Sequence, residues 1–283
     1  MVHAPQPGAP HLARGSRAAS TLSLSPYLST DGQKIGAADL ARAPVYKAPP
    51  PAAPAWSWTG FYVGVNGGYG WGTDPVSFAN VNTLPILFTA GAIPTAVNTS
   101  PAGGLAGIQL GYNWQWTPNF VLGFETDFDW ADIRGSGAVV FPGSPTIDPF
   151  RTSAEQKLTA LGTTRIRVGY ALDHALLYAT AGLAYGRTEL NTLVLDTFGG
   201  GLCGVPGLCA GASTSQWQVG WAAGVGGEWA FADAWSVRAE YLHYDLGSLT
   251  QANCDPAFTC PLINSSVDFR GDIVRGAINF RFK

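Results

Sequence analysis

The most constraining feature of this chain is a strict alternation of apolar residues with polar residues or glycine, which begins near Trp58. Successive side chains of a β-strand point to opposite faces, so each such run predicts a strand with one apolar and one polar face. In the clearest run, Phe120 to Trp130, large apolar residues and one threonine alternate with Val121, Gly123 and three acids. Residues 175–190 are apolar on both faces, so their phase stays undetermined.

The alternating runs predict eight strands and two kinds of connection. The strands cover residues 59–72, 103–116, 120–133, 156–171, 175–190, 214–231, 235–249 and 267–282. Three connections are tight, at residues 117–119, 172–174 and 232–234, and four are long, at about residues 74–102, 134–155, 191–213 and 250–266. Short periplasmic turns that alternate with long external loops are typical of outer-membrane barrels. The prediction is therefore an all-β, eight-stranded, antiparallel transmembrane up-and-down β-barrel.

The composition agrees with a barrel and excludes several other classes. Charged residues make up 12% of the 283 residues, about half of the ~25% usual in soluble domains. The aromatic content of 12%, with 10 Trp, argues against an intrinsically disordered chain. The 16 Lys and Arg against 19 Asp and Glu give a net charge of −3, which argues against a nucleic-acid partner. Because no apolar run reaches the ~18 residues of a spanning helix, the sequence excludes a helical membrane protein.

The polar face of the predicted strands carries five acids and five arginines. These residues are Glu125, Asp127, Asp129, Glu228 and Glu240, and Arg165, Arg167, Arg238, Arg275 and Arg281. Equal numbers of opposite charges suit a narrow lumen in which buried charges must pair, and we predict a lumen salt-bridge network. A metal site at the row of acids on residues 125–129 is the alternative, which the facing arginines disfavour.

The apolar face, by contrast, concentrates aromatic residues beside the tight turns. They are Trp114, Trp116, Phe120, Phe231 and Trp235. Aromatic girdles lie at the membrane–water boundary of outer-membrane barrels, so we predict that this face contacts outer-membrane lipid. A soluble sandwich or a lipocalin-like barrel, with the apolar face buried instead, is the alternative.

Residues 1–55 lack this alternation and contain no Trp. They end in a Pro-rich run, residues 43–54, that favours polyproline geometry and a semi-rigid linker. Residues 35–39 resemble a signal cleavage site, but residues 20–33 provide no apolar core for a signal peptide. We predict a degraded signal or export region with a disordered Pro-rich linker in residues 1–55, and the barrel in residues 56–283. A mis-assigned start, an unusual export route and a protein that is not exported are the alternatives.

Four motifs give the chain a family resemblance. They are Ala38–Leu40 with Ala43–Pro50, Trp58–Gly72, Arg238–Gly247 and Val274–Phe282. Over about residues 37–283, the chain resembles the alphaproteobacterial outer-membrane immunogenic, porin-family β-barrel proteins. The resemblance implies a bacterial outer-membrane location, a surface antigen and insertion by the barrel-assembly machinery. Lys283 departs from the family pattern, because Phe282 would normally be the last residue, which the assembly machinery reads.

Four cysteines form two close pairs, Cys203 with Cys209 and Cys254 with Cys260, each in a predicted external loop. Local disulfides are the favoured interpretation in an oxidising compartment, although three pairings are possible and a metal site is the alternative. His243 lies at the external end of a predicted strand, where we interpret it as a rim residue rather than as a catalytic group.

The leading function hypothesis is a non-enzymatic, structural and surface-exposed outer-membrane protein with a plugged lumen and four long external loops. A small diffusion porin is the first alternative, although eight strands leave an interior only just filled by side chains. A loop that binds a ligand, as some relatives bind haemin, or a host surface is the second. An enzyme is disfavoured, because the sequence has no HExxH motif, nucleophile elbow or phosphate loop. We expect no catalytic residue, cofactor or metal.

Overall fold

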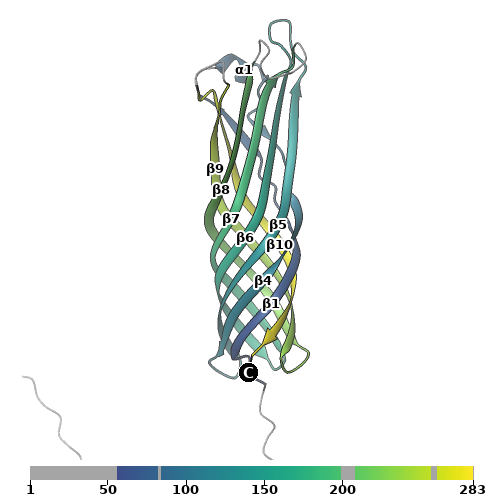
Figure 1. The fold of residues 1–283 in the computed structure, drawn as a ribbon, viewed down its shortest axis with the longest axis vertical. Coiled ribbons are helices and arrows are strands. Elements are labelled where there is room, and N and C mark those ends of the chain that lie inside the picture. Colours follow the sequence, from purple (N-terminus) through teal and green to yellow (C-terminus); the bar gives the residue numbers. More distant parts are fainter. Residues whose placement is uncertain (1–55, 82–83, 199–207, 256–259, 283) are drawn as a thin grey trace, which may run out of the picture. The chain divides into compact units, whose positions relative to one another are not determined.

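The computed structural model describes residues 56–81, 84–198, 208–255 and 260–282, in which one antiparallel sheet closes into a barrel (Figure 1). Eight long strands form the ring: β1 (Gly60–Trp71), β4 (Ala102–Gln115), β5 (Phe120–Phe141), β6 (Phe150–Leu172), β7 (Ala175–Asp196), β8 (Cys209–Ala230), β9 (Trp235–Asn253) and β10 (Ile263–Arg281). Each pairs with the next, and β1 also pairs with β10. The predicted all-β barrel is therefore confirmed. The predicted export region and linker, residues 1–55, lie outside the described residues.

Two further strands are short, and they extend the existing sheet without adding a strand to the ring. They are β2 (Val76–Asn80) and β3 (Ala96–Val97), and the segment between them holds helix α1 (Pro85–Thr89). Trp71 of β1 and Ser77 of β2 are six residues apart, and their partners on β10 are also six apart, so β2 keeps the register of β1. Pro75 precedes β2 and Pro101 precedes β4; proline has no N–H for a ladder, which explains the interruptions. In the described residues, no helix has the length and hydropathy to cross a membrane.

Six strands, β5 to β10, are longer than predicted. β5, β6, β7 and β8 contain 22 or 23 residues, about twice the 9–11 that cross a membrane. The predicted loops at residues 134–155, 191–213 and 250–266 are therefore wrong in extent, because strands continue into all three; β5 and β6 are joined by residues 142–149 alone. The cause is local composition. At residues 134–138, arginine, glycine, serine and alanine replace the large apolar residues, so hydropathy no longer marks the strand.

The phase that the sequence left open at residues 175–190 is settled by β7. Leu176, Ala184 and Leu190 are fully buried, whereas Leu177 and Leu183 are 57% and 60% exposed. The buried leucines and alanine pack into apolar clusters inside the barrel. Both faces of this strand are apolar because one forms the apolar outer surface and the other packs into the apolar clusters inside the barrel.

The buried side chains of the described interior lie in three layers. Beside the tight turns, an apolar cluster surrounds Trp58, whose indole N–H donates to the Asp173 carbonyl at 3.0 Å. A charged layer lies in the middle. Toward the end that carries α1 in Figure 1, a second apolar cluster includes Val76, Phe78, Ile93, Val97, Ile133, Leu158, Leu190, Val194, Leu246, Leu249 and Phe269. Because β2 and β3 contribute to this cluster, the first long connection is packed against the barrel rather than free.

Candidate functional site

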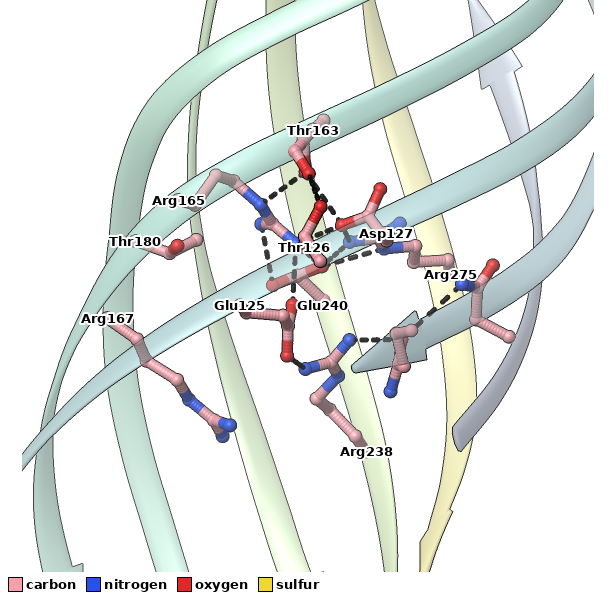
Figure 2. Close-up of polar contacts among 12 residues, drawn as sticks. Glu125, Thr126, Asp127, Thr163, Arg165, Arg167, Thr180, Arg238, Glu240 and Arg275 are labelled. Carbon is pink, nitrogen blue, oxygen red and sulfur yellow. Dashed lines mark hydrogen bonds and ion pairs between the residues drawn. The ribbon is translucent and has the colours of Figure 1, made fainter. Parts of the chain in front are cut away.

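The alternation of strand residues places the charged layer in the lumen. On β5, Glu125, Asp127 and Asp129 point inward and are at most 3% exposed. Glu125 lies opposite Arg165 of β6 in the ladder. Figure 2 shows acids and arginines from β5, β6, β9 and β10 pointing toward one another at this level. With Glu228 of β8, the charged members of the layer come from five of the eight ring strands.

Arg165 is the first centre of the network. Its Nη2 lies 2.8 Å from Glu125 Oε1 and 2.8 Å from Asp127 Oδ2, and its Nη1 lies 3.0 Å from Glu240 Oε1. Its Nε donates to Thr163 Oγ1 at 2.8 Å. The guanidinium is fully buried, so its donors are directed to protein acceptors on three strands, β5, β6 and β9.

Arg275 is the second centre and also contacts three carboxylates. Its Nη2 lies 3.0 Å from Asp127 Oδ2 and 2.7 Å from Glu240 Oε2, and its Nη1 lies 3.0 Å from Asp129 Oδ2. Asp127 and Glu240 are thus shared between the two centres, whereas Arg275 is the one arginine that Asp129 contacts. Buried charges require such pairing, because removal from water is costly for each ion.

The remaining two arginines join the network toward the tight turns. Arg238 pairs with Glu125, and Arg167 pairs with Glu228. The guanidinium of Arg167 also stacks 3.7 Å from the ring centroid of Tyr178, a cation–π contact. The structure therefore brings nine of the ten predicted lumen residues into one connected region.

The tenth residue, Arg281, does not belong to the network, which corrects the prediction. It lies at the last position of β10 and donates to the backbone carbonyls of Ser57 at 2.8 Å and Asp233 at 3.2 Å. Its guanidinium also lies 4.3 Å from the ring centroid of Trp56. Alternation correctly predicts the face on which Arg281 lies, but not its level, which is the mouth of the barrel.

Several neutral residues of the layer were missed by sequence reasoning. They are Tyr62, Gln109, Thr163, Tyr178 and Asn279, which donate to or accept from the charged groups. Tyr62 and Gln109 lie on the polar face of their alternating runs, so their inward direction was available from the sequence. Tyr178 was not, because it belongs to the strand whose phase the sequence leaves open.

On the outside, exposed aromatic residues form two bands. The five predicted girdle residues, Trp114, Trp116, Phe120, Phe231 and Trp235, are between 45% and 68% exposed. A second band, which was not predicted, contains Trp71, Trp130, Trp217 and Trp221, also exposed. On β5 the outward apolar run from Phe120 to Trp130 has 11 residues, the length that crosses a membrane. The second band marks the positions where outward polar residues begin.

The remaining candidates lie outside the charged layer. Cys254 and Cys260 form a disulfide, whereas Cys203 lies outside the described residues and its pairing with Cys209 stays a prediction. His243 is on the outer wall, where its Nδ1 lies 2.8 Å from Asp272 Oδ1. Within the described ranges, no cluster of three or more His, Cys, Asp or Glu residues could hold a metal ion.

The sequence of this barrel is similar to that of a family of known proteins. The model of the outer membrane protein β-barrel domain matches residues 42–269. The chain belongs to the outer membrane protein β-barrel domain family. The 31 kDa outer-membrane immunogenic protein of Brucella melitensis is 32% identical over 240 residues, covering 82% of this chain and 88% of that relative. The 22 kDa outer membrane protein of Rhizobium leguminosarum is 30% identical over 199 residues, covering 70% and 69%.

Membership of this family makes the chain an outer-membrane protein with a lipid-facing wall, and the predicted resemblance is confirmed. Its named relatives are outer-membrane and immunogenic proteins. Among solved structures, OprG of Pseudomonas aeruginosa has a TM-score of 0.43 at 11% identity, covering 79% of this chain and 96% of that one. Neisserial surface protein A has a TM-score of 0.36 at 13% identity, covering 79% and 98%. At these scores neither protein informs the function of this barrel.

Proposed function

We propose that this outer-membrane barrel is a non-enzymatic, structural and surface-exposed protein with a closed lumen. Lipid surrounds the wall between the two aromatic bands, and the strand extensions beyond the second band raise four connections toward the cell surface. Insertion by the barrel-assembly machinery belongs to the same proposal, and the family membership of the chain supports it.

The observation that carries the proposal is that arginines bridge the lumen. Arg165 on β6 contacts Glu240 on β9, and Arg275 on β10 contacts Asp127 on β5. Two strands separate the members of each pair along the ring, so their side chains meet only across the interior. A diffusion pore would require these contacts to break, which disfavours the porin alternative. The apolar layers on both sides of the charged layer support the same conclusion.

Planar-bilayer recording tests the proposal directly. A difference in gel migration between unboiled and boiled samples should first show that the full chain is folded, because a closed ladder resists detergent until it is heated. The folded barrel should then give no steady porin-sized current, while a known porin in the same lipid does. A reproducible conductance step from heat-modifiable protein would overturn the closed lumen and favour the diffusion pore.

A variant sharpens this recording. Arg165→Ala combined with Arg275→Ala removes both bridges at the centre of the lumen, whereas Thr250→Ala changes an exposed residue on β9. If the bridges close the barrel, the double variant should conduct more often than Thr250→Ala at equal amounts of folded protein. Equal silence of both variants would assign closure to the apolar layers, and equal conductance of both would contradict the proposal.

A further inference from the structure

The buried charged layer is not neutral once Arg281 is placed at the mouth of the barrel. Among the described residues of this layer, four arginines remain: Arg165, Arg167, Arg238 and Arg275. Five acids face them: Glu125, Asp127, Asp129, Glu228 and Glu240. All nine are at least 95% buried. The layer therefore holds one carboxylate more than it has arginines, and an excess charge in a dry site is strongly unfavourable.

Asp129 is the acid with the fewest partners. Each of the other four receives at least two hydrogen bonds or ion pairs, as Asp127 does from Arg165, Arg275 and Thr163. Arg275 is the one arginine that Asp129 contacts, through Oδ2, and the Asn66 side chain is its neutral hydrogen-bonding neighbour, while its Oδ1 is buried with no hydrogen-bond partner. Of the five carboxylates, Asp129 is consequently the one whose negative charge is compensated least.

A second unpartnered oxygen lies beside it. Asn66 of β1 pairs with Gly107 of β4, and Gly107 pairs with Asp129 of β5, so the three residues form one row across the wall. Gly107 has no side chain, and a Cβ there would collide with Asp129 Oδ1. Asn66 is 93% buried, at 7% exposure, and its Oδ1 also has no hydrogen-bond partner. Two buried oxygens without donors thus lie in neighbouring positions at the least compensated acid.

We propose that the layer binds one proton, held as a carboxylic acid on Asp129 beside Asn66. One proton cancels the excess charge at the carboxylate that has an oxygen without a donor, and it needs no cavity. The charged groups that face Asp129 are Asp127 on β5, Arg165 on β6, Glu240 on β9 and Arg275 on β10, while β1 and β4 present only neutral residues. The inference rests on the filled interior of the proposed function, but it does not require the absence of conductance.

Infrared spectroscopy and unfolding together test the proton. The folded full chain in detergent should show a carboxylic acid C=O band in mildly acidic buffer, and Asp129→Asn, which mimics the neutral acid, should lose that band. In the unfolded chain Asp129 is ionised above about pH 4. The folded protein then binds one proton more, so its unfolding equilibrium constant should rise by up to about tenfold per pH unit between about pH 4 and the pH at which the folded acid ionises. Asp129→Asn should lack this dependence.

The matched control is Asp127→Asn, two residues earlier on the same face. Asp127 contacts both Arg165 and Arg275, so its neutral variant should unfold more readily than the wild type at every pH. The proposal is overturned if Asp129→Asn behaves like Asp127→Asn and the carboxylic acid band is absent. It is also overturned if replacing choline by sodium at constant ionic strength stabilises the wild type alone, because a metal ion would then supply the charge. A conducting barrel that keeps the band would reject the closed lumen and leave the proton site standing.

Discussion

The two halves of the barrel wall have opposite polarity although they belong to the same strands. In the half between the aromatic bands, Phe124 of β5 is exposed outside and Glu125 is buried inside. Beyond the second band, Asp132 and Arg134 of the same strand are exposed outside, and Ile133 is buried inside. The ladder of β5 with β6 continues through both halves, with a bulge where they meet. One backbone architecture therefore carries two opposite distributions of side chains.

The difference teaches that the surrounding solvent, not the sheet, decides which residues point where. Lipid cannot hydrate charges, so the membrane half has an apolar exterior and collects its charges inside, where they must pair. Water surrounds the extended half, which therefore resembles a soluble barrel with residues such as Leu158 and Leu190 inside. Charge pairing stabilises the interior of the first half, and apolar burial stabilises that of the second.

The largest expected effect comes from breaking the network of the membrane half. Arg165→Ala removes a guanidinium that contacts three carboxylates, and stranding buried partners typically costs ~3–5 kcal/mol. Glu240→Ala removes a carboxylate that contacts both Arg165 and Arg275, so it should lower the stability by a similar amount. The measurement is the urea midpoint of the folded barrel in detergent, followed by tryptophan fluorescence.

Thr250→Ala is the control, because Thr250 is exposed on β9 in the extended half. It should shift the urea midpoint by much less than either network variant. Equal shifts for all three variants would mean that the charged layer does not stabilise the membrane half, and the contrast between the halves would lose its energetic basis.

A smaller effect should locate the boundary between the two halves. Phe124 and Val140 are both on β5, at 53% and 63% exposure, but only Phe124 lies between the aromatic bands. Phe124→Arg places a charge near the middle of the lipid and should destabilise the barrel by ~2–4 kcal/mol, whereas Val140→Arg should change little. The comparison uses unfolding of both variants in lipid vesicles. If Val140→Arg were as damaging as Phe124→Arg, the membrane would extend over the second half.

The same contrast explains how much the sequence could predict. In the membrane half, lipid outside and paired charges inside produce a clear alternation of apolar and polar residues. The eight ring strands and the inward acids of β5 were therefore predictable. In the extended half, small and polar residues such as those at 135–138 blur the pattern, and the strands were mistaken for loops. The phase of β7 was hidden because apolar clusters occupy the lumen on both sides of the charged layer.

Alternation also could not predict the height of a side chain along the barrel axis. A two-residue period gives the face of a side chain and not its height, so Arg281 was assigned to a network that it does not reach. The pairing register of β10 with β1 and β9 provides that height. The excess acid at Asp129 follows only from the corrected position, and no count of charges in the sequence reveals it.

The smallest expected effect lies in the connections, outside both halves. The Cys254–Cys260 disulfide joins residues six apart in sequence, just beyond the end of β9. Closing so short a ring restricts the unfolded chain by about 2 kcal/mol in the chain-entropy model. Both halves have their own sources of stability, so a Cys254→Ser, Cys260→Ser double variant should still insert and remain heat-modifiable. Non-reducing peptide mapping should find Cys254 joined to Cys260, and the same map tests the predicted Cys203–Cys209 bridge. A variant that no longer inserts, or a map that joins Cys254 to either cysteine of the other pair, would show that the connections constrain the barrel rather than merely extend from it.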